Sequence, residues 1–375
     1  MKTSAARQVR AKRNRKRSQQ VRVDDIARAV GVSGATVSRA LTRTGPVSER
    51  VLRRIEAAAL ELGYVPNGAA RALASRKART IGAIIPTLEN LGFASGAEAM
   101  QRCVIEAGYS FLVASTGYDP SREFAQVRSF AAHGVDGVML VGSSRDPAVT
   151  DFLRTQRIPH VVTWTLADTG TPSVGFDNRE AARRLTQHLL DLGHRQIAVI
   201  AGQTFRNDRA AARVAGIHQA LAERGLALPQ EHLLERPYRI AEGQLALRAL
   251  MATEQPPTAI VCGNDQLAFG ALIECGRQGI PVPRQLSIVG FDDLEFAGQI
   301  APSLTTVHVP AEEIGRRAAE YLLARIAGRA APITTEVVTN LIIRESTAPP
   351  PAPSAGPRQA MERRLGTKMD RTSNG

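Results

Sequence analysis

The first recognisable chemistry in this chain is a group of small and polar residues around one arginine. We expect residues 34–41 to form a helix in which Val37 and Leu41 point inward. The outward residues are then small or polar: Gly34, Ala35, Thr36, Ser38 and Arg39. An arginine can donate two hydrogen bonds to O6 and N7 of guanine, and a small residue at most touches a thymine methyl group. Hydroxyl groups suit phosphate oxygens. These residue types predict contacts with double-stranded DNA.

Two short helices are expected to position Arg39. Apolar residues of the first helix recur at helical spacing: Val23, Ile26, Ala27 and Val30. Gly31 ends that helix, and Ser33 is placed to cap the next one. Two helices joined by such a short turn are typical of a helix-turn-helix, whose second helix enters the major groove. Outside this setting Arg39 would be an ordinary surface arginine.

A third helix completes a minimal core. Ser48 is a candidate N-cap and Gly63 a candidate C-cap. Between them lies one apolar stripe: Val51, Ile55, Ala59 and Leu62. Three helices within residues 21–65 therefore form an all-α headpiece.

Positive charge is concentrated at the start of the chain. The 375 residues carry 48 Lys and Arg and 35 Asp and Glu, a formal net charge of +13. Residues 1–80 hold 19 of these bases and five acids, whereas the remainder holds 29 bases and 30 acids. This division predicts a polyanion partner for the cationic head and a different partner for the body.

Two segments beside the headpiece have open interpretations. Residues 1–20 have too few apolar residues for a core and are expected to be a disordered basic arm. The arm is either a solvated tail or a salt-sensitive contact to phosphates. Residues 66–79 are either a simple tether or a hinge that becomes helical when two copies pack on DNA. In the second case Leu73 is a wedge in the minor groove and Asn67 another DNA contact.

From residue 81 onward, apolar runs of strand length alternate with segments of helix length. The expected strands are 81–85, 111–114, 137–141, 160–163, 173–176, 197–201, 258–262, 287–290 and 305–309. The expected helices include 97–107, 122–132, 179–192, 212–224 and 265–278. This alternation is typical of an α/β fold with parallel sheets. Nine strands fit two sheets better than one.

Three runs resemble the LacI/GalR (lactose-repressor/galactose-repressor) family of bacterial transcription regulators. They are VDDIARAVGVSGATVSRAL, VSERVLRRIEAAALELGYVPNGAARALAS and the strand-like TIGAIIP. The resemblance extends from about Val21 to about Glu345, and the long basic arm before Val21 departs from the family pattern. It implies that Gly34, Ala35 and Arg39 read bases, Thr36 and Ser38 contact phosphates, and Leu73 enters the minor groove.

The resemblance also implies a body of two Rossmann-like lobes with a type I periplasmic-binding-protein-like fold. The expected parts are 1–20 (arm), 21–65 (helix-turn-helix headpiece), 66–79 (hinge), 80–346 (effector-binding body) and 347–375 (disordered tail). We expect one lobe from 80–177 with 310–332, and the other from 178–309 with 333–346. A ligand cleft would lie between the lobes.

Ligands of open α/β sheets bind beyond the carboxyl ends of the strands. Those ends carry residues 87–93, Trp164, 202–213, 263–265 and 290–293. The resemblance places effector contacts on Phe93, Arg213, Tyr238, Asn264 and Asp292. We add Trp164 at the expected mouth of the cleft. Gly92 stands where some relatives carry an aromatic residue, and Tyr238 also fits an ordinary core aromatic.

Several charged residues near these positions also have a structural interpretation. Asp265 fits a cap of the next helix better than a ligand contact, and Asp292 fits either a ligand acceptor or a brace for its loop. Arg206 and Arg209 fit solvated loop charges, but with Arg213 they place three guanidinium groups within eight residues. This grouping favours an acidic effector, such as a sugar acid.

The sequence gives no support for catalysis or for a cofactor. It has no phosphate-binding glycine motif, no nucleophile motif and no Cys/His cluster, and His188 and His194 fit surface groups. Three cysteines make no disulfide framework. No apolar run is long enough to cross a membrane, and the first twenty residues do not resemble a secretion signal. We therefore expect a cytoplasmic protein.

The main hypothesis is a ligand-responsive transcription factor, most simply a repressor. We expect a homodimer on a pseudo-palindromic operator, controlled by a sugar or sugar acid such as gluconate. A tetramer is the alternative, although no heptad repeat is visible near the C-terminus. Rival hypotheses are a cytoplasmic sugar-binding sensor, a non-specific nucleoid-type DNA binder and an α/β enzyme with a DNA-binding head.

Overall fold

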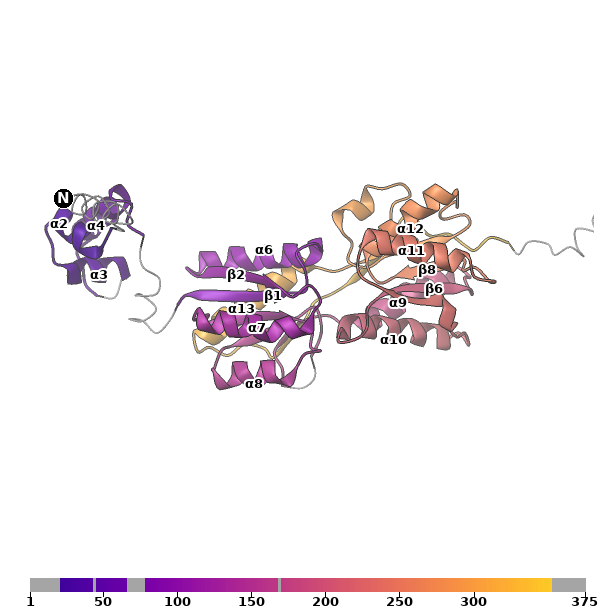
Figure 1. Ribbon diagram of the computed structural model, residues 1–375, viewed down its shortest axis with the longest axis horizontal. Coiled ribbons are helices and arrows are strands. Elements are labelled where there is room, and N and C mark those ends of the chain that lie inside the picture. The colour runs from indigo at the N-terminus through magenta and orange to yellow at the C-terminus, as the bar shows by residue number, and fades with distance from the viewer. Residues whose placement is uncertain (1–20, 43–44, 66–77, 168–169, 353–375) are drawn as a thin grey trace, which may run out of the picture. The chain divides into compact units, whose positions relative to one another are not determined.

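The computed structural model describes residues 21–42, 45–65, 78–167 and 170–352 (Figure 1). The chain separates into two compact units, Met1–Arg79 and Thr80–Gly375. The expected arm, Asn67 and Leu73 lie outside the described residues.

The first unit contains the three predicted helices. They are α2 (Val23–Val30), α3 (Gly34–Thr42) and α4 (Glu49–Glu61). Ile26, Val37 and Ile55, one from each helix, are completely buried against one another. Burying this apolar surface stabilises helices that are too short to persist alone.

The caps of these helices largely follow the sequence signals. Gly31 ends α2 in the left-handed conformation, with a φ of 71°. The Ser33 hydroxyl accepts a hydrogen bond from the backbone N–H of Thr36 at 3.1 Å, which confirms the predicted cap of α3. Ser48 occupies the N-cap position of α4, but its side chain makes no capping hydrogen bond.

Lobe 1 of the second unit has six parallel strands in the order β11-β5-β4-β3-β1-β2. Its strands are β1 (Thr80–Ile85), β2 (Ser110–Ser115), β3 (Gly137–Val141), β4 (His160–Thr163), β5 (Ser173–Gly175) and β11 (Thr334–Glu336). Its helices are α6 (Leu91–Glu106), α7 (Pro120–Ala132), α8 (Pro147–Thr155) and α13 (Ala311–Ile326). Buried residues of α6 and α13 pack on one face of the sheet, and those of α7 and α8 pack on the other.

Lobe 2 has four parallel strands in the order β7-β6-β8-β9. Its strands are β6 (Ile197–Gly202), β7 (Leu233–Arg236), β8 (Ala259–Cys262) and β9 (Ser287–Val289). Its helices are α9 (Asn178–Asp191), α10 (Asp208–Ala222), α11 (Ile240–Met251) and α12 (Asp265–Gln278), with short 3-10 turns at Gln230–His232 and Glu295–Gly298. Helices α9 and α10 cover one face, while α11 and α12 cover the other (Figure 1).

The chain crosses between the lobes beside a small two-stranded sheet. This sheet pairs β10 (Thr306–His308) with β12 (Asn340–Ile342) in the antiparallel sense. One predicted lobe boundary is wrong, because residues 333–346 do not all belong to lobe 2. Strand β11 pairs with β5, so Thr334–Glu336 extends the sheet of lobe 1 before the chain returns.

The predicted tail also begins too early. The backbone N–H of Ile288 donates to the carbonyl of Ser346 at 2.9 Å, and that of Ala348 donates to Oγ of Ser287 at 3.1 Å. His194, predicted at the surface, is only 1 % exposed, and its Nε2 lies 2.9 Å from the carbonyl oxygen of Ala348. The chain through Ala348 therefore satisfies polar groups at the edge of the lobe 2 sheet. Residues 353–375 lie outside the described part.

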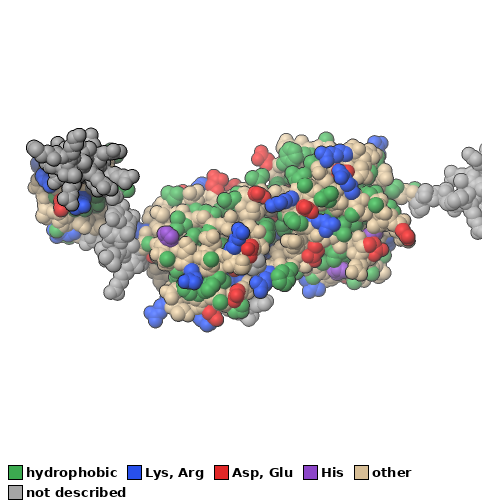
Figure 2. Space-filling model, in the orientation of Figure 1, with side chains coloured by type: hydrophobic (Ala, Val, Ile, Leu, Met, Phe, Trp, Pro, Cys, Tyr) green, Lys and Arg blue, Asp and Glu red, His purple; other side chains and the backbone are tan. Residues whose placement is uncertain are grey.

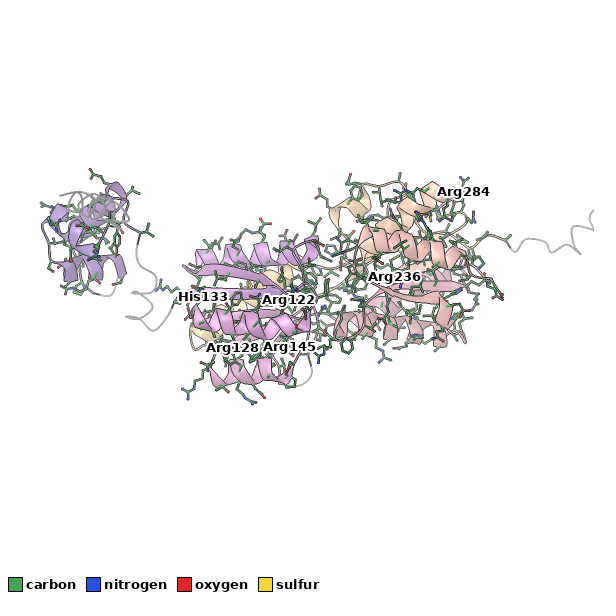
Figure 3. All side chains as sticks on the ribbon, in the orientation of Figure 1. Arg122, Arg128, His133, Arg145, Arg236 and Arg284 are labelled. Carbon is green, nitrogen blue, oxygen red and sulfur yellow. The ribbon has the colours of Figure 1, made fainter. Side chains whose placement is uncertain are left out.

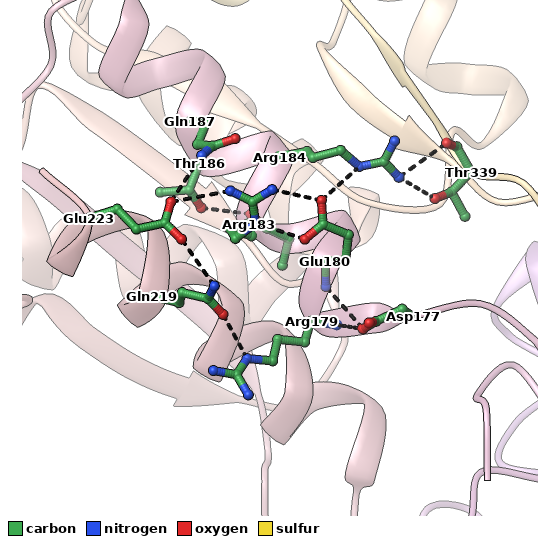
Figure 4. Close-up of polar contacts among 11 residues, drawn as sticks. Asp177, Arg179, Glu180, Arg183, Arg184, Thr186, Gln187, Gln219, Glu223 and Thr339 are labelled. Atoms are coloured by element: carbon green, nitrogen blue, oxygen red, sulfur yellow. Dashed lines mark hydrogen bonds and ion pairs between the residues drawn. The ribbon is translucent and has the colours of Figure 1, made fainter.

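Helices α9 and α10 pack closely and share a surface network (Figure 4). Arg183 donates to both oxygens of Glu180, at 2.7 and 2.9 Å, and to Glu223 at 3.2 Å. Because the carboxylates are partly exposed, these ion pairs add little stability. The close approach depends instead on Gly216 of α10, where an added Cβ would overlap the carbonyl oxygen of Arg179.

This packing gives a stability prediction. We expect Gly216→Ala to lower the free energy of unfolding by about 1–3 kcal/mol, because α10 must move away from α9. The control is Gly276→Ala in α12, where an added Cβ meets no atom within 4 Å. That exposed helical substitution should raise stability by up to about 1 kcal/mol. Urea denaturation of both variants tests the difference, and equal midpoints would contradict it.

Candidate functional site

Helix α3 presents the residues predicted to contact DNA. Ala35, Ser38 and Arg39 are exposed, whereas Gly34 and Thr36 are half-buried. The Thr36 hydroxyl lies 2.9 Å from that of Ser33, so the two hydroxyls share a hydrogen bond. Arg39 Nε donates to the carbonyl of Ala35 at 3.3 Å, which aligns the side chain along the helix. The exposed guanidinium is thus held by its own helix and stays available to a partner.

Loops from both lobes converge on a second site in the body. They follow the carboxyl ends of β1, β2, β3, β4, β6, β7, β8 and β9, as the parallel topology predicts. The site has two compartments that share Tyr118, Asn207, Arg209 and Tyr238. The inner compartment has a volume of about 30 Å³, and the outer one about 420 Å³. The outer volume is in the range of small-molecule sites, whereas the inner one holds about one or two waters.

The inner compartment gathers all the residues predicted to contact the effector. They are Phe93, Trp164, Arg213, Tyr238, Asn264 and Asp292. Phe93 and Trp164 meet edge to face, with ring centroids 5.1 Å apart. Trp164 is only 3 % exposed, so it lies deep in the cleft and not at the mouth, as was expected.

Arg213 is held firmly within the inner compartment. Its Nε donates to Oδ1 of Asn178 at 2.9 Å, and its Nη1 donates to the carbonyl of Gly263 at 2.7 Å. Its Nη2 lies 4.0 Å from Oδ1 of Asp292, and the guanidinium stacks 3.6 Å from the Phe291 ring centroid. Two of the five N–H donors of Arg213 are therefore engaged by the protein, and its Nη2 faces a carboxylate.

Asp292 also lines the inner compartment, next to Arg213. Its backbone has a φ of 118°, a conformation that non-glycine residues rarely adopt. Burial raises the pKa of its carboxyl group, while Arg213 and the Asn90 amide oppose that rise. Asn90 Nδ2 donates to Oδ2 of Asp292 at 3.2 Å. Because Asn90 belongs to lobe 1, this bond crosses the cleft.

The helix cap predicted at Asp265 is wrong. Asn264 caps α12, because its Oδ1 accepts from the backbone N–H of Leu267 at 3.0 Å. The buried Asp265 accepts from the N–H of Leu294 at 2.7 Å and from the hydroxyl of Thr306 at 2.6 Å. Burial raises its pKa. Asp265 therefore braces the loop that carries Asp292, and it does not line either compartment.

The outer compartment contains groups that the sequence reasoning did not select. Tyr118 and Tyr238 face each other across it, with ring centroids 5.8 Å apart. Glu123 lines the wall of the outer compartment and accepts a hydrogen bond from Arg145 at 3.0 Å. Figure 3 labels Arg145 at the end of lobe 1 that meets lobe 2. Burial raises the pKa of Glu123, and the nearby Arg145 charge opposes the rise. Arg209, a residue that also fitted a solvated charge, is only 8 % exposed.

Asp208 makes a second connection between the lobes. Its Oδ2 accepts from the backbone N–H and the hydroxyl of Ser143, both at 2.9 Å. Burial disfavours its ionised form, but Arg209, Ser143 and Thr165 outweigh burial and lower its pKa. Ser143 and Thr165 follow β3 and β4 of lobe 1, whereas Asp208 begins α10 of lobe 2. Asp208 therefore joins two loops of one lobe to the other lobe.

Neither a metal site nor a membrane-spanning helix is found among the described residues. No group of three or more His, Cys, Asp or Glu side chains there is arranged to hold a metal ion. Within the same residues, every helix is too short or too polar to cross a membrane.

A helix-turn-helix unit joined to a two-lobed body with a ligand cleft defines a class of DNA-binding regulators. Family comparisons agree with this class. Residues 22–67 match the model described as "Bacterial regulatory proteins, lacI family", and residues 186–347 match a "Periplasmic binding protein-like domain".

Similar proteins cover nearly the whole chain. The HTH-type transcriptional regulator GntR of Pseudomonas aeruginosa is 35% identical over 328 residues, which are 87% of this chain and 95% of that protein. The HTH-type transcriptional repressor PurR of Vibrio campbellii is 32% identical over 308 residues, or 81% of this chain and 91% of that protein. The solved lac repressor dimer, bound to operator and an anti-inducer, has a TM-score of 0.78 at 26% identity, covering 88% of this chain and all of that one.

The chain therefore belongs to the LacI family of bacterial transcription regulators. The resemblance inferred from the sequence is confirmed, as is the fold of a helical headpiece with a type I periplasmic-binding-protein-like body. As a member of this family, the protein is a DNA-binding transcription regulator and not an enzyme.

The bridge at Asp208 can be tested with Trp164, the single tryptophan of the chain. We expect Asp208→Ala to separate the lobes more often, because two loops of lobe 1 lose their acceptor. Acrylamide should then quench Trp164 emission roughly twofold more strongly. The control is Asp191→Ala, which removes an exposed acid from the end of α9. Identical quenching in both variants would contradict the bridging role.

Proposed function

We propose that the protein is a repressor that binds a pseudo-palindromic operator as a homodimer in the bacterial cytoplasm. A small sugar or sugar acid, such as gluconate, controls its affinity for DNA. The proposal rests on the presence of two features in one chain. One is helix α3, which exposes residues suited to contact DNA, and the other is a cleft lined by polar loops from two lobes. A tetramer is an alternative assembly, and its C-terminal contacts would lie outside the described residues.

The DNA part of the proposal rests on α3. Two copies of this helix, about one turn of DNA apart, would enter successive major grooves. The lac repressor, solved as a dimer on its operator, supports this arrangement. Arg39 would grip a guanine, Thr36 and Ser38 would contact phosphates, and Ser33, Gly34 and Ala35 would allow a close approach. Asn67 and Leu73 would add minor-groove contacts.

The effector part rests on the chemistry of the cleft. Phe93, Trp164 and Tyr238 offer ring faces and edges, while Asn264 and Asp292 offer amide and carboxylate groups for hydroxyls. The outer compartment adds arginines, which suit an acid group. A related regulator, CelR, was solved with cellobiose, at 27% identity and a TM-score of 0.64, and supports a carbohydrate-like ligand.

The body itself offers little to attract DNA. Figure 2 shows acidic and basic side chains interspersed over the visible face of the second unit. Residues 81–375 carry nearly equal numbers of acids and bases, so the excess positive charge lies before them. We therefore assign DNA binding to the first part of the chain and control to the body.

Selection of genomic fragments by the purified protein at physiological salt tests the whole proposal. Enrichment of a palindrome of about 14–20 base pairs, weakened or strengthened by added gluconate, supports it. Diffuse and salt-labile enrichment would instead favour a non-specific nucleoid-type binder. Metabolite binding without any DNA selection would favour a sensor protein.

Arg39 gives a residue-level prediction. Arg39→Ala should reduce operator preference by about 1–3 kcal/mol, roughly 5- to 150-fold, while weak binding at low salt remains. Arg53→Ala is the control, because Arg53 is an exposed arginine of α4 that pairs with Glu49 at 3.2 Å. Competition between operator and scrambled duplexes measures the preference. Equal losses in both variants would reject the assignment of Arg39 as a base-reading residue.

A further inference from the structure

Arg209 is a buried cation between the two compartments of the cleft. It is the second residue of α10, and it lines both the inner and the outer compartment. Only 8 % of the residue is exposed. Among the described residues its side chain makes one hydrogen bond, from Nη1 to Oδ1 of Asp208 at 3.0 Å. A guanidinium has five N–H donors, so most of those of Arg209 remain for a ligand.

Arg213 provides a useful comparison within the same helix. Its Nε and Nη1 donate to Asn178 and Gly263, and its Nη2 faces Asp292 at 4.0 Å. An acid group that reached Arg213 would have to compete with these partners and approach the Asp292 carboxylate. Arg209 has a single hydrogen-bond partner among the described residues, Asp208 at 3.0 Å, and Ser143 engages the other oxygen of that carboxylate.

Gly142 makes the position of Arg209 possible. This glycine follows β3 with a φ of 76°, and an added Cβ would overlap Nη1 of Arg209 and Oδ1 of its partner Asp208. The guanidinium of lobe 2 therefore lies directly against the backbone of lobe 1. Any larger residue at position 142 would push Arg209 out of this place.

The outer compartment provides the remaining features of a ligand site. Its charged lining residues are Glu89, Glu123, Arg206, Arg209 and Arg239. Because Glu123 is paired with Arg145, the lining favours a negative ligand. Hydroxyl and amide groups line the same wall at Thr87, Thr116, Ser144, Gln203 and Asn207. Burial raises the pKa of Tyr118 and Tyr238, and the Arg209 charge opposes the rise in both.

We propose that Arg209 is the specificity-determining residue for the acid group of the effector, and that the outer compartment holds the hydroxylated remainder. The ligand is a compact polyhydroxy anion, whose acid group is a carboxylate or a phosphate. The proposal rests on the proposed function and deepens it, because it places recognition of charge on Arg209 and not on Arg213. The volume of about 420 Å³ suits the bulk of such a molecule, whereas the inner compartment of about 30 Å³ has room only for a single hydroxyl-bearing end that reaches Asn264 and Asp292.

Calorimetric titration of the full-length protein tests this assignment. The probes are D-gluconate, glucose 6-phosphate and uncharged glucose. We expect one of the two anions to bind at least about tenfold more tightly than glucose, which identifies the acid group. Arg209→Gln should reduce the affinity for that anion at least about tenfold, and Gly142→Ala should reduce it by displacing Arg209. Far-ultraviolet circular dichroism shows whether each variant keeps its fold.

Arg195→Gln is the matched control. Arg195 is exposed on the same lobe and lies before β6, whose carboxyl end leads to α10, so it is remote from the cleft. Its variant should bind the anion as the unaltered protein does. Retained anion affinity in a folded Arg209→Gln variant would overturn the assignment while leaving the proposed function intact. Binding of glucose as tight as that of the anions, or of none of the three probes, would overturn the ligand class. Operator binding by the same sample would still decide the DNA-binding part separately.

Discussion

The body of this protein depends on one geometric constraint: every strand of its two main sheets is parallel, so the carboxyl ends of each sheet lie at one edge. The loops at those edges supply the lining of both cleft compartments. Since both lobes contribute, the cleft exists only while the lobes stay together. Bonds such as Asn90 to Asp292 and Ser143 to Asp208 cross between them. A ligand in the cleft therefore acts on the same contacts that set the arrangement of the lobes.

Several buried charged residues in and around the cleft depend on specific partners. A buried ion needs close partners to offset its lost hydration. Glu123 has Arg145, Asp208 has Arg209 and Ser143, and Asp265 has the hydroxyl of Thr306 with a backbone N–H. Arg209 is the buried charge whose donors are least satisfied by the protein. The proposed acidic ligand would offset part of the cost of burying this charge.

Much of the fold and of the inner compartment could be predicted from the sequence. Strands such as 81–85 and 137–141 are nearly continuous apolar runs, and Phe93, Asn264 and Asp292 lie just beyond the predicted strands 81–85, 258–262 and 287–290. Strands β7, β11 and β12 were missed because their sequences, LLER, TTE and NLI, contain no apolar run that stands out from the neighbouring loops. Arg209 was noted only as one of three neighbouring arginines, and its burial could not be predicted. Tyr118 and Asp208 could not be selected, because their roles depend on which loops meet across the lobes. The role of Asp265 was misassigned because a polar residue after a strand resembles a helix cap until its hydrogen bonds are seen.

The central claim is that the cleft and the operator-binding helices are thermodynamically coupled. Titration of D-gluconate into the protein alone, and into the protein saturated with its selected operator duplex, tests this claim most directly. The account predicts two different affinities, typically about 5- to 150-fold apart, with the same factor found when operator affinity is measured with and without gluconate. Tight gluconate binding that is unaffected by the operator would contradict it.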